Sequence, residues 1–344
     1  MIDLTNPPSG PAITAARPLA VPGAYHEKVW GRTRCGMRLG EIWFRLRPLL
    51  LKFIFTSEKL SVQVHPGDEY AARHDHSLGK TECWYVMDTE LGARLAVGLR
   101  QPLSTAELRA AVNDGSIEKE LNWIEVRSGD FVFVPWGTVH AIGAGLTLCE
   151  IQEFSDMTYR LYDYGRPREL HLEKAMDVVR QHPAAGRRVG VAARGVAPAE
   201  ASTGGEAAVA GGRTGTGPRP ESATGTTGGA AGIVHEFLVG CRYFAVERLA
   251  TPREYHTAVE SDGFEVLVFL KGEGAITGRE FSGRYGEEQM WRLPGRMGEY
   301  RIVPERETAW LRVYAPPSLD DFRERLRRAG LAADEVKRVV VDDL

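Results

Sequence analysis

The sequence has almost no excess charge and lacks any long hydrophobic run. Its 43 Lys and Arg residues against 46 Asp and Glu give a formal net charge of −3, so nothing favours nucleic acid or an anionic membrane as a partner. The most apolar stretch, residues 49–55, is interrupted by Lys52 and is far shorter than the roughly 18 apolar residues of a membrane helix. We therefore expect no nucleic-acid partner and no membrane partner.

Cysteine is also scarce. The four cysteines are widely scattered and form no CxxC pair: Cys35, Cys83, Cys149 and Cys241. This spacing is not that of a disulfide framework. The first twenty residues lack the basic start and apolar core of a secretory signal. Together these features predict free thiols in a cytoplasmic protein.

Composition divides the 344 residues into four regions. Residues 184–232 consist mainly of Gly, Ala, Thr, Ser, Pro and Arg, with almost no large apolar side chains. Such a segment cannot bury enough surface to offset its ordering entropy, so we predict a low-complexity flexible linker there. The linker would separate a first domain at 1–183 from a second domain at 233–316, followed by a helical tail at 317–344.

Short apolar runs separated by Gly, Pro and Asp dominate both predicted domains. In the first domain these runs lie at residues 50–65, 81–87, 93–98, 131–134 and 146–154. The spacing is typical of an antiparallel sandwich or barrel. We therefore predict a mainly β protein with two β-barrels of similar size and a few short helices.

Two segments have helical signals instead. Residues 104–121 begin with Ser104 as a predicted N-cap, and Glu107 completes a capping box. Near the end of the chain, Ser318 and acidic residues precede an amphipathic pattern over 319–328.

The strongest chemical signal is a set of potential metal ligands. Gln63 and His65 are two apart in a predicted strand and so project to the same face, and Glu82 opens the next apolar segment. His140 ends a Gly, five residues, Pro-x-Gly-x-x-His pattern that starts at Gly129 and fits the second cupin motif. Two imidazoles, a carboxylate and an amide oxygen suit a divalent ion such as Zn²⁺. A lone histidine after a turn is usually only a surface or core residue, so the pairing with Glu82 carries this interpretation.

Several motifs in the right order resemble a known family. The segments LSVQVHP, GKTECWYVM, PWGTVHAIGAGL and SDMTYRLYDYGRPRELHLEKA, with the leading KVWGR and GEIWF, resemble the type I mannose-6-phosphate isomerases in their short bacterial form, within the cupin superfamily. The resemblance implies a catalytic metal-binding cupin domain of jelly-roll type with one Zn²⁺ per chain. It also implies a second, degenerate cupin domain without metal.

The resemblance assigns roles to individual residues. Those that match the zinc ligands are Gln63, His65, Glu82 and His140. Arg160 matches the catalytic arginine, Asp156 and Glu150 match acidic residues of the same pocket, and Lys80 matches a lysine at the substrate end. Ser61 and Lys52 match positions associated with the substrate phosphate.

The implied reaction interconverts mannose 6-phosphate and fructose 6-phosphate through a cis-enediol. It needs a base for the proton and fixed positive charge for the developing oxyanion. Glu150 is the first choice for the base, with a metal-bound water or Asp156 as alternatives. The sequence leaves the oligomeric state, the metal used in the cell and the direction of the pathway open.

Some positions depart from the family pattern. Trp136 stands where a small residue is usual in the PxGxxH turn, and Gly67 replaces the acidic residue common after His-Pro. The connection between GEIWF and LLLKFIF is also shorter than in most members. None of these departures removes a proposed ligand or Arg160.

Three other functions compete with this hypothesis. An Fe(II)-dependent cupin oxygenase also uses two histidines and a carboxylate, but it usually presents a histidine where Gln63 stands. A non-catalytic sugar-binding cupin would not need Arg160, Lys80 and Glu150. A cupin isomerase for another phosphosugar, such as glucose 6-phosphate, fits the same residues.

Overall fold

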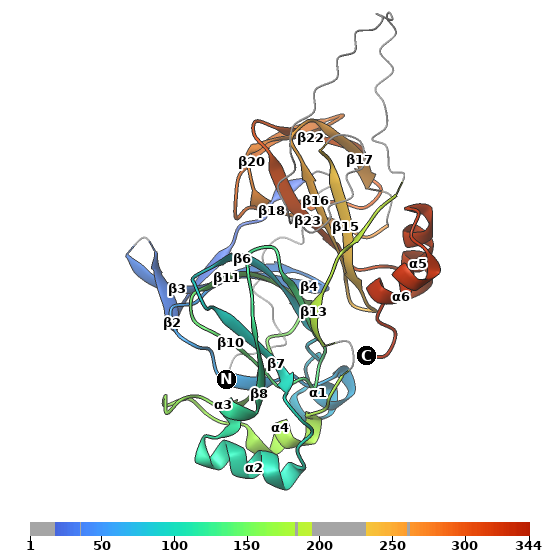
Figure 1. The fold of residues 1–344 in the computed structure, drawn as a ribbon. Helices are drawn as coiled ribbons and strands as arrows, with labels where there is room; N and C mark the ends of the chain where they lie inside the picture. Colours follow the sequence, from blue (N-terminus) through green and yellow to red (C-terminus); the bar gives the residue numbers. More distant parts are fainter. Residues whose placement is uncertain (1–17, 35, 183–184, 195–231, 260–261) are drawn as a thin grey trace, which may run out of the picture.

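The protein is described by a computed structural model, which covers residues 18–34, 36–182, 185–194, 232–259 and 262–344. The described residues form two β-barrels stacked one above the other, with short helices at the far end of the first barrel and beside the second (Figure 1). The fold is mainly β, as the sequence predicts. None of the described helices combines the length and the apolar character needed to span a bilayer.

The first barrel consists of two antiparallel sheets. The seven-stranded sheet has the order β13(Gly186–Arg188), β9(Phe131–Val134), β6(Glu82–Thr89), β11(Leu146–Glu153), β4(Leu49–Phe55), β3(Met37–Leu46) and β2(Ala24–Arg34). The five-stranded sheet has the order β12(Tyr159–Tyr162), β5(Val62–Val64), β10(His140–Ile142), β7(Arg94–Leu99) and β8(Leu121–Glu125). The predicted apolar runs therefore lie on strands of these two sheets, although the run at 50–65 is divided between β4 and β5.

The second barrel repeats this plan. Its larger sheet has the order β1(Leu19–Ala20), β21(Met290–Leu293), β18(Glu265–Lys271), β23(Thr308–Tyr314), β16(Ala245–Thr251), β15(Val234–Gly240) and β14(Val191–Ala192). Its smaller sheet has the order β17(Tyr255–Val259), β22(Gly298–Pro304), β19(Gly274–Gly278) and β20(Phe281–Tyr285).

Alternation along the strands divides the large sheet of the first barrel into two different faces. On β4, β6, β9 and β11 the odd-numbered side chains, such as Phe53, Cys83 and Cys149, join one buried cluster with Val246 and Leu311 of the second barrel. The even-numbered side chains of these strands, such as Trp84, instead line the interior of the first barrel. Because strand side chains alternate between faces, Lys52, Glu82 and Glu150 share this inward face. Cys83 and Cys149 point away from it.

The helices cover the ends of the barrels. They are α1(Asp68–Asp75), α2(Thr105–Asp114), α3(Ile117–Glu120), α4(Leu172–Val178), α5(Leu319–Arg328) and α6(Ala333–Val339). Ser104 and Glu107 form the predicted capping box, and Ser318 caps α5. The single helix expected over 104–121 is wrong, because Gly115 adopts a left-handed conformation with φ +77° that ends α2.

The chain crosses between the barrels more often than the sequence suggests. β1 precedes the first barrel in sequence but pairs with β21 of the second. Residues 186–188 and 191–192, assigned above to the linker, form β13 and β14 and extend one sheet of each barrel. They do so because each finds an open edge strand, and Val191 is buried against the terminal helices. The rest of the predicted linker lies outside the described residues, apart from 185, 189–190, 193–194 and 232.

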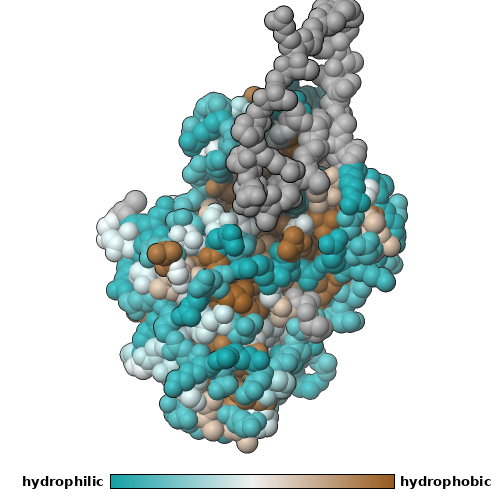
Figure 2. Space-filling model, viewed as in Figure 1, coloured by the Kyte–Doolittle hydropathy of each residue, from teal (hydrophilic) through white to brown (hydrophobic). Residues whose placement is uncertain are grey.

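Apolar side chains reach the surface only in places. Figure 2 shows a mostly hydrophilic face, with apolar patches near the middle of the molecule where the two barrels meet. Exposed large apolar side chains include Tyr25, Val29, Leu91 and Val189.

Candidate metal centre and active site

The register of three neighbouring strands brings the predicted site residues into one row. Gln63 on β5 pairs with His140 on β10 to one side and with Arg160 on β12 to the other. His65 follows β5 by one residue. Glu82 comes from the opposite sheet, as the first residue of β6. The two sheets of the first barrel therefore face each other with the amide and imidazoles on one side and the carboxylate on the other.

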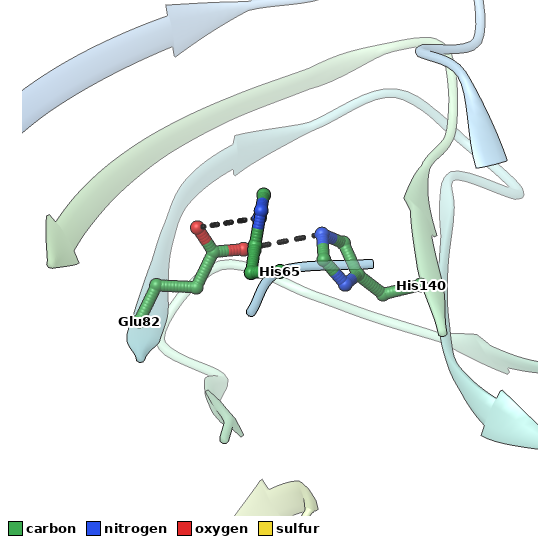
Figure 3. Close-up of side chains that lie close together, drawn as sticks. All are labelled: His65, Glu82 and His140. Atoms are coloured by element: carbon green, nitrogen blue, oxygen red, sulfur yellow. Dashed lines mark ion pairs between the residues drawn. The ribbon is translucent and has the colours of Figure 1, made fainter. Parts of the chain in front are cut away.

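The side chains of His65, Glu82 and His140 converge in the barrel interior (Figure 3). Nε2 of His65 lies 3.4 Å from Oε2 of Glu82, and Nε2 of His140 lies 3.4 Å from its Oε1. One ligand atom from each residue fits within 4.8 Å of the other two. All three residues are buried, with exposed fractions of 0–1%.

Backbone carbonyls fix which imidazole nitrogen faces the centre. Nδ1 of His65 lies 2.7 Å from the carbonyl oxygen of Met157, and Nδ1 of His140 lies 2.9 Å from that of Thr138. A carbonyl only accepts, so each Nδ1 carries the proton and each Nε2 presents a lone pair to the centre. Burial, and the nearby ammonium of Lys80, lower the pKa of His65 to about 3. Burial likewise lowers the pKa of His140.

Glu82 is an ionised carboxylate in this setting. Burial alone would raise its pKa, but the ammonium of Lys80, 2.8 Å from Oε2, and the imidazole of His65 hold the pKa well below its ordinary value. Nε2 of His65 and both carboxylate oxygens of Glu82 have no hydrogen bond within the described residues, although Lys80 balances part of the charge. Lone pairs of neutral imidazoles thus face a carboxylate with no proton between them, which is an arrangement that a cation stabilises.

A line of alternating charges continues from Glu82 along the inward face of the large sheet. Nζ of Lys80 lies 3.8 Å from Oε1 of Glu150, and Nζ of Lys52 lies 3.0 Å from the same oxygen. Nε1 of Trp84 donates to Oε2 of Glu150 at 3.0 Å. Burial opposes the charge of Lys80, but Glu150 and Glu82 raise its pKa above the ordinary value. Lys80 is therefore held as a cation between Glu82 and Glu150, and Lys52 also pairs with Glu150.

Glu41 on β3 is a buried carboxylate that the sequence reasoning missed. It lies 3.0 Å from Nζ of Lys28 and accepts from Nε1 of Trp43 at 2.7 Å. Burial raises its pKa, but the charges of Lys52 and Lys28 outweigh burial and hold the pKa below its ordinary value. The aromatic ring of Trp43 also lies under Lys52, whose Nζ is 4.7 Å from the ring centroid. The signal in the sequence was a charged residue inside the apolar segment GEIWF.

The other predicted residues lie at different distances from this cluster. Oγ of Ser61 donates to Oε1 of Gln63 at 3.2 Å, and the amide nitrogen of Gln63 lies 3.1 Å from Nε2 of His140. Arg160 neighbours Gln63 in the sheet, but its guanidinium donates to the carbonyl of Glu169 at 2.6 Å. Asp156 is exposed. Among the described residues, no side-chain contact joins its carboxylate to the cluster, because the loop after β11 turns it to solvent.

Comparison with known proteins identifies relatives of one kind. No protein-family model matches the chain. A mannose-6-phosphate isomerase of Bacillus subtilis is 43% identical over 162 residues, which are 42% of this chain and 51% of that protein. A mannose-6-phosphate isomerase of Streptococcus mutans is 46% identical over 138 residues, 38% of this chain and 43% of that protein. The chain thus spans about half the length of the curated relatives it matches.

Solved structures extend the likeness to most of the chain. The crystal structure of mannose 6-phosphate isomerase from Bacillus subtilis superposes with a TM-score of 0.70 at 24% identity, covering 86% of this chain and 99% of that one. Phosphomannose isomerase from Salmonella typhimurium in its apo form gives a TM-score of 0.56 at 12% identity, over 86% and 98% of the two chains. The chain is therefore a relative of the mannose-6-phosphate isomerases in sequence and shares the cupin fold of the phosphomannose isomerases.

Proposed function

We propose that this protein is a metal-dependent aldose–ketose isomerase that interconverts mannose 6-phosphate and fructose 6-phosphate. The observation that carries the proposal is the buried trio of His65, Glu82 and His140, whose ligand atoms lie within 4.8 Å of one another, with Nε2 of His65 and both Glu82 oxygens lacking a hydrogen-bond partner among the described residues. The charged line of Lys80, Glu150 and Lys52 beside it supplies groups for proton transfer and for anion binding. The curated relatives carry the name of this activity.

We propose one Zn²⁺ as the ion, because two neutral imidazoles and a carboxylate are a usual zinc donor set that leaves positions for substrate. Gln63 would be the fourth ligand through its amide oxygen. In the structure its nitrogen faces His140 and its oxygen accepts from Ser61, so ligation requires a half-turn of the amide. The ion, when bound, supplies Lewis acidity that stabilises negative charge developing on a substrate oxygen.

Glu150 is the proposed base. Its carboxylate is buried, oriented by Nε1 of Trp84 and paired with Lys52, so it is positioned to take a proton from the carbon next to the sugar carbonyl and return it to the neighbouring carbon. Asp156 is a weaker candidate because its side chain is exposed. Lys80 and Arg160 would provide fixed positive charge for the enediol intermediate.

Ser61 and Lys52 are the proposed phosphate contacts. Lys52 already pairs with Glu150 and lies over the Trp43 ring, so a phosphate there would share its ammonium with Glu150. We also propose that the protein works in the cytoplasm. Cys83, Cys149 and Cys241 are free thiols, which is consistent with a reducing compartment.

The decisive experiment measures isomerisation of mannose 6-phosphate with and without a chelator, in the wild type, in Arg160→Ala and in Arg284→Ala. Arg284 is an exposed residue of the second barrel paired with Glu305, so it is the matched control. We expect chelation to abolish turnover, zinc to restore it, and only Arg160→Ala to depress it. A folded, zinc-loaded protein that converts glucose 6-phosphate but not mannose 6-phosphate would refute the proposed substrate, and one that converts neither would refute the isomerase.

A further inference from the structure

Trp136 occupies the place where the turn before His140 meets the turn after His65. The guanidinium carbon of Arg180 lies 3.3 Å from the centroid of the Trp136 ring system. Gly67 lies so close to the same indole that a Cβ atom added there would be 2.8 Å from Cδ2 and Cε2. The indole is therefore in contact with the backbone of one turn and with the side chain that follows α4.

The contact with Trp136, and not the backbone conformation, explains why residue 67 is a glycine. Gly67 has φ −80° and ψ 166°, an extended conformation that any residue adopts. A side chain is excluded because even its first carbon would collide with Trp136. The absence of a side chain at position 67 therefore leaves the space that the indole at position 136 fills.

Backbone hydrogen bonds connect the turn at Trp136 and Gly137 to the segments that carry the candidate metal ligands. The amide of Gly137 donates to the carbonyl of His65 at 2.8 Å, and the amide of Arg180 donates to the carbonyl of Gly137 at 2.8 Å. Nε of Arg180 also donates to the carbonyl of Trp136 at 3.3 Å. These bonds join the two histidine-bearing turns to each other and to the end of α4.

The segment that carries Glu82 reaches the same place. The amide of Trp136 donates to Oγ1 of Thr81 at 3.4 Å, and the amide of Lys80 donates to the carbonyl of Pro66 at 2.9 Å. Three segments, one for each of His65, Glu82 and His140, therefore meet at Trp136, through its backbone amide as well as its indole. A displacement of Trp136 would therefore reach all three segments.

We propose that Trp136 is a positioning residue for the metal centre, held by Gly67 and Arg180 so that it sets the spacing of the three turns and with it the affinity for the ion. The inference rests on the metal site of the proposed function. It concerns residues that do not touch the ion, and residues behind the ligands of a metal site typically change affinity by about 10- to 100-fold when they are replaced.

A double-mutant cycle tests the proposal on the full-length protein. The zinc dissociation constant is measured by competition with a chromophoric chelator for Gly67→Ala, Trp136→Ala and the double variant. Gly67→Ala should weaken zinc binding by about tenfold or more, as expected for groups behind the ligands, because its Cβ displaces the indole. In the Trp136→Ala background the same change should have less than a threefold effect, on the order expected for non-coupled sites. Equal effects of Gly67→Ala in both backgrounds would overturn the proposal.

Further variants separate positioning from folding. Gly286→Ala is the control, because a Cβ there has only Nε2 of Gln289 nearby, at 3.9 Å, and it should bind zinc like the wild type. Trp136→Phe keeps an aromatic ring beside Gly67 and should retain zinc affinity better than Trp136→Ala. The ligand-field spectrum of the Co²⁺-substituted protein should shift in Gly67→Ala and not in Gly286→Ala. A Gly67→Ala protein that melts at a lower temperature but keeps its zinc affinity and Co²⁺ spectrum would show a purely structural role and overturn the inference.

The readouts also distinguish this inference from the proposed function. Zinc affinity and the Co²⁺ spectrum need no substrate, so coupling without isomerase turnover would refute the function alone. Normal turnover without coupling would refute the role of Trp136 alone.

Discussion

Lys52 and Glu150 lie directly opposite each other on β4 and β11, with Nζ and Oε1 3.0 Å apart. Both side chains are almost fully buried, at 5% and 4% exposure. A buried charge without a partner is costly in free energy, so each of these two residues compensates the buried charge of the other. Replacing either residue to test its proposed catalytic or phosphate-binding role should therefore also change the stability of the protein.

Replacing Lys52 tests this coupling. Lys52→Met removes the nearer cation and leaves Glu150 with Lys80 at 3.8 Å, so we expect a loss of about 3 kcal/mol in the free energy of unfolding. Lys52→Met/Glu150→Gln should lose less, because no uncompensated carboxylate remains. Urea denaturation of the chelator-treated proteins measures both values. A single variant within about 0.5 kcal/mol of the wild type, the range of ordinary surface changes, would contradict the coupling.

Removing the metal should lower stability as well as activity. An ion present at 100 times its dissociation constant stabilises the folded state by about 2.7 kcal/mol, so chelation should reduce the melting temperature measurably. Glu82→Gln should lose stoichiometric zinc and become insensitive to the chelator. His256→Gln is the control, because His256 pairs with Glu254 in the second barrel. Zinc content by plasma emission spectrometry and melting curves report the outcome, and unchanged zinc content in Glu82→Gln would speak against the site.

Arg160 should matter in the transition state more than in substrate binding. A fixed cation that stabilises a developing oxyanion typically contributes about 10²- to 10³-fold to the rate, so Arg160→Ala should lower kcat by that order. Arg160→Lys should recover only part of it, because an ammonium lacks the planar fork of guanidinium donors. Steady-state kinetics decide the point. A rise in KM with an unchanged kcat would place Arg160 in ground-state binding only.

Glu153 should make stability depend on pH. It is buried at the end of β11, and its Oε1 accepts from the amide of Thr81 at 2.6 Å. Burial first, and then the nearby charge of Asp68, raise its pKa from 4.5 to about 8. The folded state therefore binds a proton that the unfolded state has released. The stabilising contribution is complete below pH 4.5 and is lost as the pH rises towards about 8.

The matching experiment compares unfolding free energies at pH 5 to 9 in the wild type, Glu153→Gln and Glu280→Gln. Glu153→Gln should reduce the decline of the unfolding free energy with rising pH. Glu280→Gln, at an exposed position, should leave this decline unchanged. Asp68 also contacts Tyr243 and Arg242 of the second barrel, so the same measurements should be repeated in Asp68→Asn. Identical slopes in the wild type and Glu153→Gln would exclude this carboxyl as the titrating group.

The second barrel should support stability without taking part in chemistry. Glu247 is fully buried and binds Nε of Arg325 and Nε2 of His235, each at 2.8 Å, and the hydroxyl of Tyr314 at 2.8 Å. Glu247→Gln leaves Arg312 and Arg325 with less compensation, so we expect a loss of about 3 to 5 kcal/mol. At a temperature where the variant remains folded, kcat/KM should equal that of the wild type. A fall in kcat/KM there would assign the second barrel a role in catalysis.

The sequence predicts those parts of the fold that depend on local patterns. Alternation identified the strands around Lys52, Glu82 and Glu150, and the capping box at Ser104 was correct because it needs only neighbouring residues. The break at Gly115 was missed because Ile117 and Leu121 continue the apolar pattern beyond it. β1 and β14 were missed because two residues form a strand only when a partner strand lies beside them.

The site was predictable to the extent that its residues belong to motifs. The structure brings His65, Glu82 and His140 together from three separate segments, which sequence spacing alone only suggested. Glu41 was missed because its importance comes from Lys28 and Lys52 on neighbouring strands. Asp156 matched a motif position, yet its orientation depends on how the loop leaves β11, which no local pattern encodes.

The pairing of β1 with β21 determines when the molecule can be completed during synthesis. Leu19 and Ala20 leave the ribosome long before their partners Arg292 and Trp291. The first barrel can form its own sheets while β1 is still unpaired, whereas the larger sheet of the second barrel gains this edge strand only from a segment that precedes the first barrel. Separate production of the two barrels would therefore yield one product with an unused strand and another with an unfilled edge.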